Sequence, residues 1–401
     1  MRKLVKIGKT PAPASWAEKI EQAPIADKFF LCGVISGLYG VSYLGIHLLL
    51  MLHGAMTPWS SYVQERRFHA TIQVFLFFGC FILGFLFQAA PKLFQQNSHV
   101  SRFSIALIMP LVTGVLLAHF LPDIFPGNCL ISASFLVALL LVAKVIASAG
   151  MDVILGMGLP VITALAAFSL GALSNIENPL HALIVTWLGL AGSILAASQQ
   201  FIQGFLGGRR LAARDGLMVS SLLLVSGCSL CAFVFLQYEA GWSLFAYSAA
   251  ATLLVFIWQT RLYTAAFKPS RDPIYIGSLF GWSWALIGAC FAIQGPHTAD
   301  AVLHIWATGW GTTLIITLAP RIIGFLGGRA VLRHGRLMLL ILVWQLVPLG
   351  RGVFTTGPWP AVVAAAAALS FLPWSCIMAW NLLRLLRRQL MLRQGQKMVQ
   401  C

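Results

Sequence analysis

Long apolar runs alternate with short polar connections along the whole chain. Each run approaches the about 20 residues that an α-helix needs to cross the roughly 30 Å hydrocarbon core of a bilayer. Backbone polar groups in lipid must be hydrogen-bonded within their own segment, which favours helices. We therefore predict an all-α polytopic membrane protein with about twelve transmembrane helices. Their approximate limits are 29–52, 71–90, 102–120, 129–149, 153–173, 181–203, 217–236, 242–262, 274–293, 301–323, 336–350 and 360–384.

Composition supports the same fold class. Of 401 residues, 59% are hydrophobic and 9% are charged, which leaves too little polar surface for a water-facing shell. We expect one transmembrane domain over residues 29–386, a basic cytoplasmic segment at 1–28 and a basic cytoplasmic tail at 387–401. The first 28 residues are polar and basic without a cleavage site, so no removable signal peptide is expected.

The basic residues are unevenly distributed across the predicted membrane. With the N-terminus placed inside, all but three of the 27 Lys and Arg residues fall on the inner side, and the exceptions are Arg66, Arg67 and Arg351. This asymmetry predicts that both termini are cytoplasmic. The net charge of +16 then reflects topology and contact with the lipid bilayer, not nucleic-acid binding.

An internal repeat divides the chain. The hexapeptide Gly-Phe-Leu-Gly-Gly-Arg at 204–209 recurs at 324–329. In both copies it ends a predicted helix that begins with a histidine, His181 in one and His304 in the other, and His69 opens the second predicted helix. The pattern predicts three pseudo-repeated groups of four helices, each with a histidine at the outer end of its second helix.

An acidic residue precedes each of these histidines by four positions, and the three residues are Glu65, Glu177 and Asp300. Four residues make about one helical turn, so carboxylate and imidazole can share a helix face. One interpretation is a favourable interaction with the helix dipole. The other is a carboxylate that orients a metal-bound imidazole. Both readings are open from sequence.

The repeated histidines point to a metal cofactor, since imidazole is a common ligand of haem iron and of copper. We predict His69 and His304 as the leading pair of metal ligands. His181 is the third candidate, either as a copper ligand or as a remnant of the repeat.

Arg66 and Arg67 break the charge asymmetry at the outer end of the second helix. Guanidinium groups bind carboxylates bidentately, so this pair suits an anion such as a haem propionate. Arg351 is predicted to share that role. Lipid headgroup binding is the alternative. No Asp or Glu lies inside a predicted apolar run, which disfavours a proton pump or a proton-coupled transporter.

Two stretches resemble the NnrS family of twelve-helix haem- and copper-containing membrane proteins. The first is Phe68-His69-Ala70-Thr71, followed by an apolar run that ends in Ala89-Ala90-Pro91. The second is Leu303-His304, followed by Gly309-Trp310-Gly311-Thr312 and Pro320-Arg321. Thr71 stands where the family has a second histidine, which leaves fewer candidate ligands for copper than for haem. The arrangement is also distantly similar to haem–copper oxidase catalytic subunits, but the seventh predicted helix lacks a histidine.

The resemblance implies a bacterial inner-membrane protein with a b-type haem, with copper as a second candidate cofactor. It implies a role in nitrogen-oxide metabolism or the response to nitric oxide, with a small gaseous or redox ligand and a partner in the respiratory chain. It assigns no catalytic residue. The alternatives are a membrane transporter for a small organic anion and an assembly partner of a respiratory complex.

Overall fold

The computed structural model describes residues 26–52, 62–94, 102–121, 126–174, 176, 178–267, 270–327, 330–354 and 358–399. These residues form helices and short connections, with no strand among them. Within these ranges eleven helical segments are long and apolar enough to cross a membrane, and the shorter apolar helix Ser104–Phe120 matches the third predicted run. The prediction of an all-α polytopic membrane protein is confirmed.

The α-helices carry the following bounds: α2 Ala26–Gly37, α3 Ile46–Leu52, α4 Tyr62–Thr71, α5 Gly79–Leu93, α6 Ile108–Phe120, α7 Pro126–Ala147, α8 Met151–Val153, α9 Leu159–Gly171, α10 Pro179–Val185, α11 Gly192–Phe201, α12 Ala213–Leu236, α13 Ala240–Gln259, α14 Pro273–Ile293, α15 Ala299–His304, α16 Thr313–Gly327, α17 His334–Trp344, α18 Leu346–Pro348, α19 Pro358–Ala368 and α20 Phe371–Val399. Short 3₁₀ segments occur at Arg102–Leu107, Leu262–Phe267 and Pro296–Thr298.

Segments of π-helix join many of these helices into continuous spans. They are Leu38–Gly45, Ile72–Phe78, Ile154–Gly158, Thr186–Ala191, Ile202–Leu206, Ile305–Thr312 and Leu349–Val353. One such segment follows closely after each of the repeated histidines, which supports the division into related groups. The π-helix is rare and occurs frequently at functional sites, so these segments direct attention to the surfaces they form.

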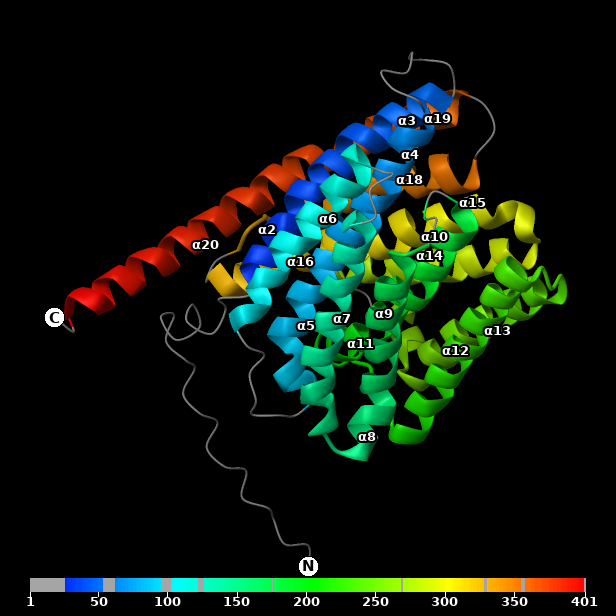
Figure 1. Cartoon of the computed structure of the whole chain (residues 1–401), viewed down its shortest axis with the longest axis horizontal. Helices are drawn as coiled ribbons and strands as arrows, with labels where there is room; N and C mark the ends of the chain where they lie inside the picture. The colour runs from blue at the N-terminus through cyan, green and yellow to red at the C-terminus, as the bar shows by residue number, and fades with distance from the viewer. Residues whose placement is uncertain are drawn as a thin grey trace, which may run out of the picture.

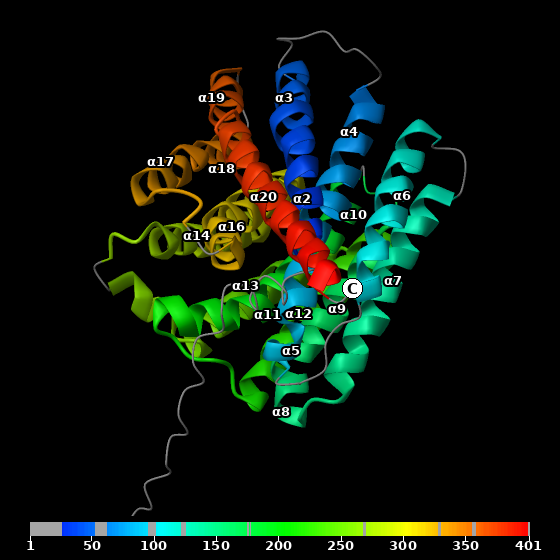
Figure 2. The same ribbon diagram turned by 90° about the vertical axis from the view of Figure 1, so that its left-hand side faces the viewer.

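The helices pack into one bundle (Figure 1). The first described helix, α2, packs against α5 and α20, so segments far apart in the chain lie together. Two buried apolar clusters fill the bundle, one centred on the first five spans with the last helices and one on the later spans around Trp187 and Trp306. Figure 2 shows α3, α4 and α19 reaching the same end of the molecule.

The repeated hexapeptide ends a helix in both copies. Gly207 adopts a left-handed backbone conformation with φ 70°, which glycine reaches without strain and which terminates the preceding segment. In the second copy α16 ends at Gly327, and Arg329 lies outside the described residues.

Two helix limits differ from the predicted ones by the widest margin. The second span begins at Tyr62 instead of residue 71, so His69 lies within a helix and not at its mouth. The last helix continues to Val399 instead of ending near residue 384, so most of the predicted basic tail is helical. In both cases charged side chains continue a helix beyond its apolar stretch, since helix formation does not require apolar residues outside lipid.

Candidate functional site

A cavity of about 320 Å³ opens at the end of the bundle that carries α3, α4, α15 and α19. We call it the main cavity. Its walls come from the first, second, sixth, tenth, eleventh and twelfth spans, and five of the seven π-helical segments contribute to them. Its volume falls within the range of sites that enclose small molecules or cofactors. His69, His304, Arg66 and Arg351 all line it.

The imidazole of His69 is held by the neighbouring span. Its Nδ1–H donates to the carbonyl oxygen of Gly40 at 3.1 Å. Close helix packing makes this possible, because a Cβ on Gly40 would lie 2.5 Å from Ile72 Cγ2 and 3.0 Å from Gln73 Nε2. Gly45 leaves room for the ring itself, since a Cβ there would lie 3.4 Å from His69 Cε1. Two glycines of the first span therefore position this histidine.

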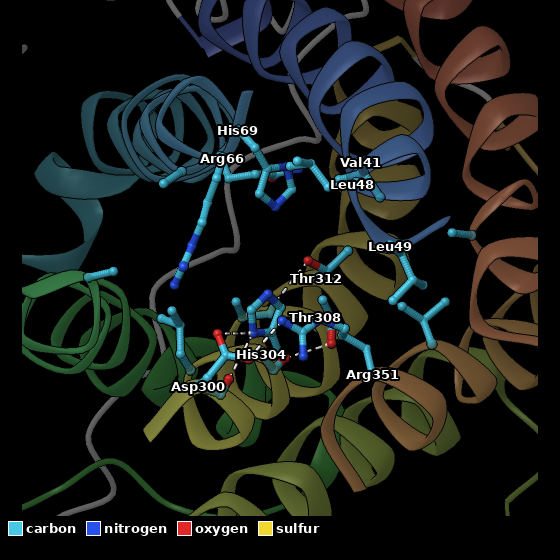
Figure 3. Close-up of a pocket in the computed structure, with 18 of the residues that line it drawn as sticks. Val41, Leu48, Leu49, Arg66, His69, Asp300, His304, Thr308, Thr312 and Arg351 are labelled. Atoms are coloured by element: carbon cyan, nitrogen blue, oxygen red, sulfur yellow. Dashed lines mark hydrogen bonds and ion pairs between the residues drawn. The ribbon is translucent and has the colours of Figure 1, made fainter. Parts of the chain in front are cut away.

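His304 is held within its own helix on the opposite wall. Its Nδ1–H donates to the carbonyl oxygen of Asp300 at 2.8 Å, and Asp300 Oδ1 lies 3.5 Å from the same nitrogen. Figure 3 shows the two imidazole rings pointing toward each other across the main cavity.

These hydrogen bonds fix the form of both rings. A backbone carbonyl only accepts, so Nδ1 carries the proton in each histidine and Nε2 of the neutral ring keeps its lone pair. That is the form in which imidazole binds a metal. The main cavity thus presents two nitrogen donors from opposite sides.

Asp300 also pairs with Arg351, whose Nη2 lies 2.7 Å from Asp300 Oδ2. Arg66 lies along the same cavity, and its side chain extends into it in Figure 3. Among the described residues no hydrogen bond or ion pair is formed by Arg66. Two guanidinium groups and one carboxylate therefore leave the described cavity wall with an excess positive charge.

Arg67 does not line the main cavity. Consecutive helical residues point in directions about 100° apart at 3.6 residues per turn, so Arg66 and Arg67 cannot both face it. Arg66 shares a face with His69 because the two are three positions apart. The adjacent pair of arginines expected from sequence is thus divided between two faces of α4.

His181 also lies outside the main cavity. Its ring packs 5.2 Å from that of Phe235, and its Nδ1 is buried without a hydrogen-bond partner among the described residues. Pro179, Ala182 and Thr186 of the same span line the cavity instead. No group of three or more His, Cys, Asp or Glu side chains in the described ranges could hold a metal ion, so His181 gains no companion ligands there.

Glu65, the carboxylate four residues before His69, contacts His47 instead of His69. Glu65 lies 2.7 Å from Nδ1 of His47, and both side chains are buried between the first two spans. Of the two interpretations left open, a carboxylate that orients the imidazole is not observed at His69, because the Gly40 carbonyl holds that ring. Asp300 does approach His304 as expected from the four-residue spacing, and Glu177 lies outside the described residues.

Several cavity residues had no signal in the sequence. Gln73 and Thr308 supply polar groups along the walls, from π-helical segments that periodicity does not reveal. Gly40 was also missed. The chain has 36 glycines, and nothing in the sequence indicates which of them has a carbonyl that accepts from His69. The π-helical segments are the structural feature that would have located them.

No curated protein matches this chain. The model of one protein family, described as NnrS protein, matches residues 28–391, a range that contains every residue lining the main cavity. The chain therefore belongs to the NnrS family.

Proposed function

We propose that the main cavity binds one b-type haem, with Nε2 of His69 and Nε2 of His304 as the axial ligands. Family membership supports a membrane protein related to nitrogen oxides. We propose a role in nitrogen-oxide metabolism or in the response to nitric oxide and nitrosative stress. The observation that carries the proposal is the pair of facing imidazoles, each with Nδ1–H bound to a backbone carbonyl.

The chemistry of the wall fits this group. Apolar side chains such as Leu48, Leu49, Val74 and Leu303 line the cavity and suit the faces of a flat aromatic ring. Arg66 and Arg351 would contact the haem propionates, and Arg66 has no competing partner among the described residues. Arg67 is not assigned this role, because it does not line the cavity.

A bound haem supplies one-electron redox chemistry and, where an axial position is open, a place for nitric oxide. The chain's own residues determine which of these applies. The Gly40 and Asp300 carbonyls keep both rings directed at the cavity, which favours two histidine ligands and a role in electron transfer or redox sensing. Release of either ring would give the site for a gaseous ligand.

Copper is less well supported than haem. A copper site needs several convergent ligands, and the described residues contain no such group. Haem needs one or two axial nitrogens, which the main cavity provides.

The membrane orientation also enters the proposal. We place the main cavity at the periplasmic face of a bacterial inner membrane, because Arg66, Arg67 and Arg351 are the exceptions to the inner location of Lys and Arg. Reporter fusions at both ends of the chain test this, and activity of a periplasm-dependent reporter at either end would overturn it.

The test of the cofactor is the reduced-minus-oxidised absorption spectrum of the purified protein. We expect the Soret and α bands of a low-spin b-type haem in the wild type. His69→Ala and His304→Ala should each shift or abolish these bands. Absence of any haem band, or bands unchanged in both variants, would end the proposal.

A transporter for a small organic anion is the second candidate, because Arg66 lines the main cavity and has no partner among the described residues. In that case uptake of an organic anion into proteoliposomes should depend on Arg66 but not on His69 or His304. Haem absorption that depends on both histidines, without such uptake, would exclude this candidate.

A further inference from the structure

A second cavity of about 110 Å³ lies deeper in the bundle, between the second, sixth and tenth spans. We call it the apolar cavity. It extends along α5, α11 and α16, with Phe30 of α2 closing one side. It and the main cavity share one lining residue, Phe78.

The wall between the two cavities is thin. Gly311 lines the apolar cavity and the next residue, Thr312, lines the main cavity. At this level Phe78 and Leu190 approach the tenth span closely, since a Cβ on Gly311 would lie 2.9 Å from Leu190 Cδ2 and 3.1 Å from Phe78 Cε1. The partition therefore consists of the Leu190 and Phe78 side chains, which pack against the backbone at Gly311.

From this partition the apolar cavity runs toward the far end of the same three spans. Phe85, Phe201 and Ile322 line its other end and are half-buried, whereas Phe78 and Leu190 at the partition are buried. About eleven residues separate the two levels on the sixth and tenth spans, which corresponds to roughly 16 Å of helix. The cavity thus leads from partly exposed apolar surface to the edge of the main cavity.

The chemistry of this cavity excludes most occupants. Its lining is aliphatic and aromatic apart from the hydroxyls of Ser193 and Ser198. Ser193 is 5% exposed, and its Oγ has no hydrogen-bond partner among the described residues. A buried water needs two to four polar partners, so an apolar wall with so few hydroxyl groups favours a small apolar occupant over water. A charged molecule would lose its hydration without compensation.

We propose that the apolar cavity takes up an uncharged diatomic gas of the size and polarity of nitric oxide and delivers it past Phe78 to the main cavity. This inference rests on the proposed function. A haem in the main cavity would fill it, and its propionates would lie at the arginines, so a gas dissolved in the bilayer needs another entrance. The hydroxyl of Ser193, which has no partner among the described residues, offers a weakly polar molecule a hydrogen-bond donor.

The direct test is a crystal structure of the full-length protein under xenon pressure, because xenon occupies dry apolar cavities of this kind. We expect xenon beside Ser193 and Ala197 in the wild type, and its loss in Ala197→Leu, which fills the cavity from α11. Ala366→Leu is the matched control, since Ala366 is exposed on α19. Water or an ordered acyl chain in place of xenon would overturn the proposal.

Delivery is tested by the rate of nitric oxide association with the reduced protein. Ala197→Leu should slow association by about tenfold, within the one to three decades over which such rates vary among variants. The absorption spectrum should be unchanged, and Ala366→Leu should behave as wild type. Leu190→Phe provides a second variant if Ala197→Leu fails to fold. An unchanged rate in the variant that excludes xenon would refute delivery.

The two proposals fail separately. If no haem band is found, the proposed function and delivery to haem are both refuted. The xenon structure still decides whether the apolar cavity receives an apolar gas. If haem is present and xenon does not bind, only this inference falls.

Discussion

The region around His69 and His304 differs from the region around His181, although the sequence places all three histidines in equivalent positions of a repeat. The first two rings face one cavity, and each is held by a backbone carbonyl. The third is buried against Phe235, with no partner for its Nδ1 among the described residues. Repetition in sequence therefore did not produce repetition of a site.

His181 lies outside the main cavity because of its angular position around the axis of its helix. On the sixth span Ala182 faces the main cavity, with Pro179 and Thr186 three positions before and four after it. His181 is one residue earlier, which turns it by about 100° toward α12. A shift of one position in the chain is enough to move an imidazole from a cavity to an apolar contact.

The largest expected effect comes from removing one cavity histidine and supplying its side chain from solution. His304→Gly should lose the low-spin haem spectrum, and free imidazole should restore it by entering the space left behind. His181→Gly should keep the wild-type spectrum with or without imidazole. Absorption spectra of the wild type and the two variants test this. Equal loss of haem absorption in both variants would show that the two regions do not differ in haem binding.

The next effect concerns the packing that holds His69. Gly40→Ala places a methyl group 2.5 Å from Ile72 Cγ2, so the first two spans must separate and the carbonyl bond to His69 must weaken. Loss of such a supporting hydrogen bond costs about 10–100-fold in metal affinity. Haem retention during titration with a competing haem-binding protein measures this. Gly335→Ala is the control, because nothing lies within 4 Å of its added Cβ, and equal affinity in the two variants would contradict the role of Gly40.

A smaller effect should separate the two neighbouring arginines. Arg66→Gln removes a charged hydrogen-bond donor from the cavity, and such bonds contribute about 1.5–3 kcal/mol, or roughly tenfold or more in haem affinity. Arg67→Gln changes the same charge on another face of α4 and should leave haem affinity near the wild-type value. Haem dissociation rates of both variants provide the measurement. If Arg67→Gln proves the more damaging, the assignment of the propionate contacts is wrong.

The smallest effect is expected at Asp300. Asp300→Asn keeps the backbone carbonyl that holds His304 but removes the charge opposite Arg351. The pair is partly solvent-accessible, with the Asp300 side chain 42% exposed, so we expect about 1 kcal/mol or less in stability. The midpoint potential of the haem should rise, because a negative charge near the oxidised iron has been removed. Redox titration measures this. An unchanged potential would show that Asp300 lies too far from the iron to act on it, and a lower potential would contradict the predicted sign.

Much of the site could be predicted from residue types and spacing. The scarcity of outer Lys and Arg made Arg66 and Arg351 stand out, and both line the main cavity. The four-residue offset correctly brought Asp300 near His304. The same offset failed for Glu65, because a closer acceptor at Gly40 and a buried partner at His47 belong to another span. Spacing describes contacts within one helix and says nothing about the helix beside it.

The sequence by itself determined the class of fold, an all-α protein with many membrane-spanning helices, since hydrophobic runs in lipid leave the backbone little choice but helix. It also identified the residue types able to bind haem. Only the tertiary structure decided which of them meet, because the π-helical segments and the close glycine contacts set the rotation and spacing of each span. The rotation and spacing of the spans depend on contacts between side chains far apart in the sequence, so they cannot be predicted from a local sequence pattern.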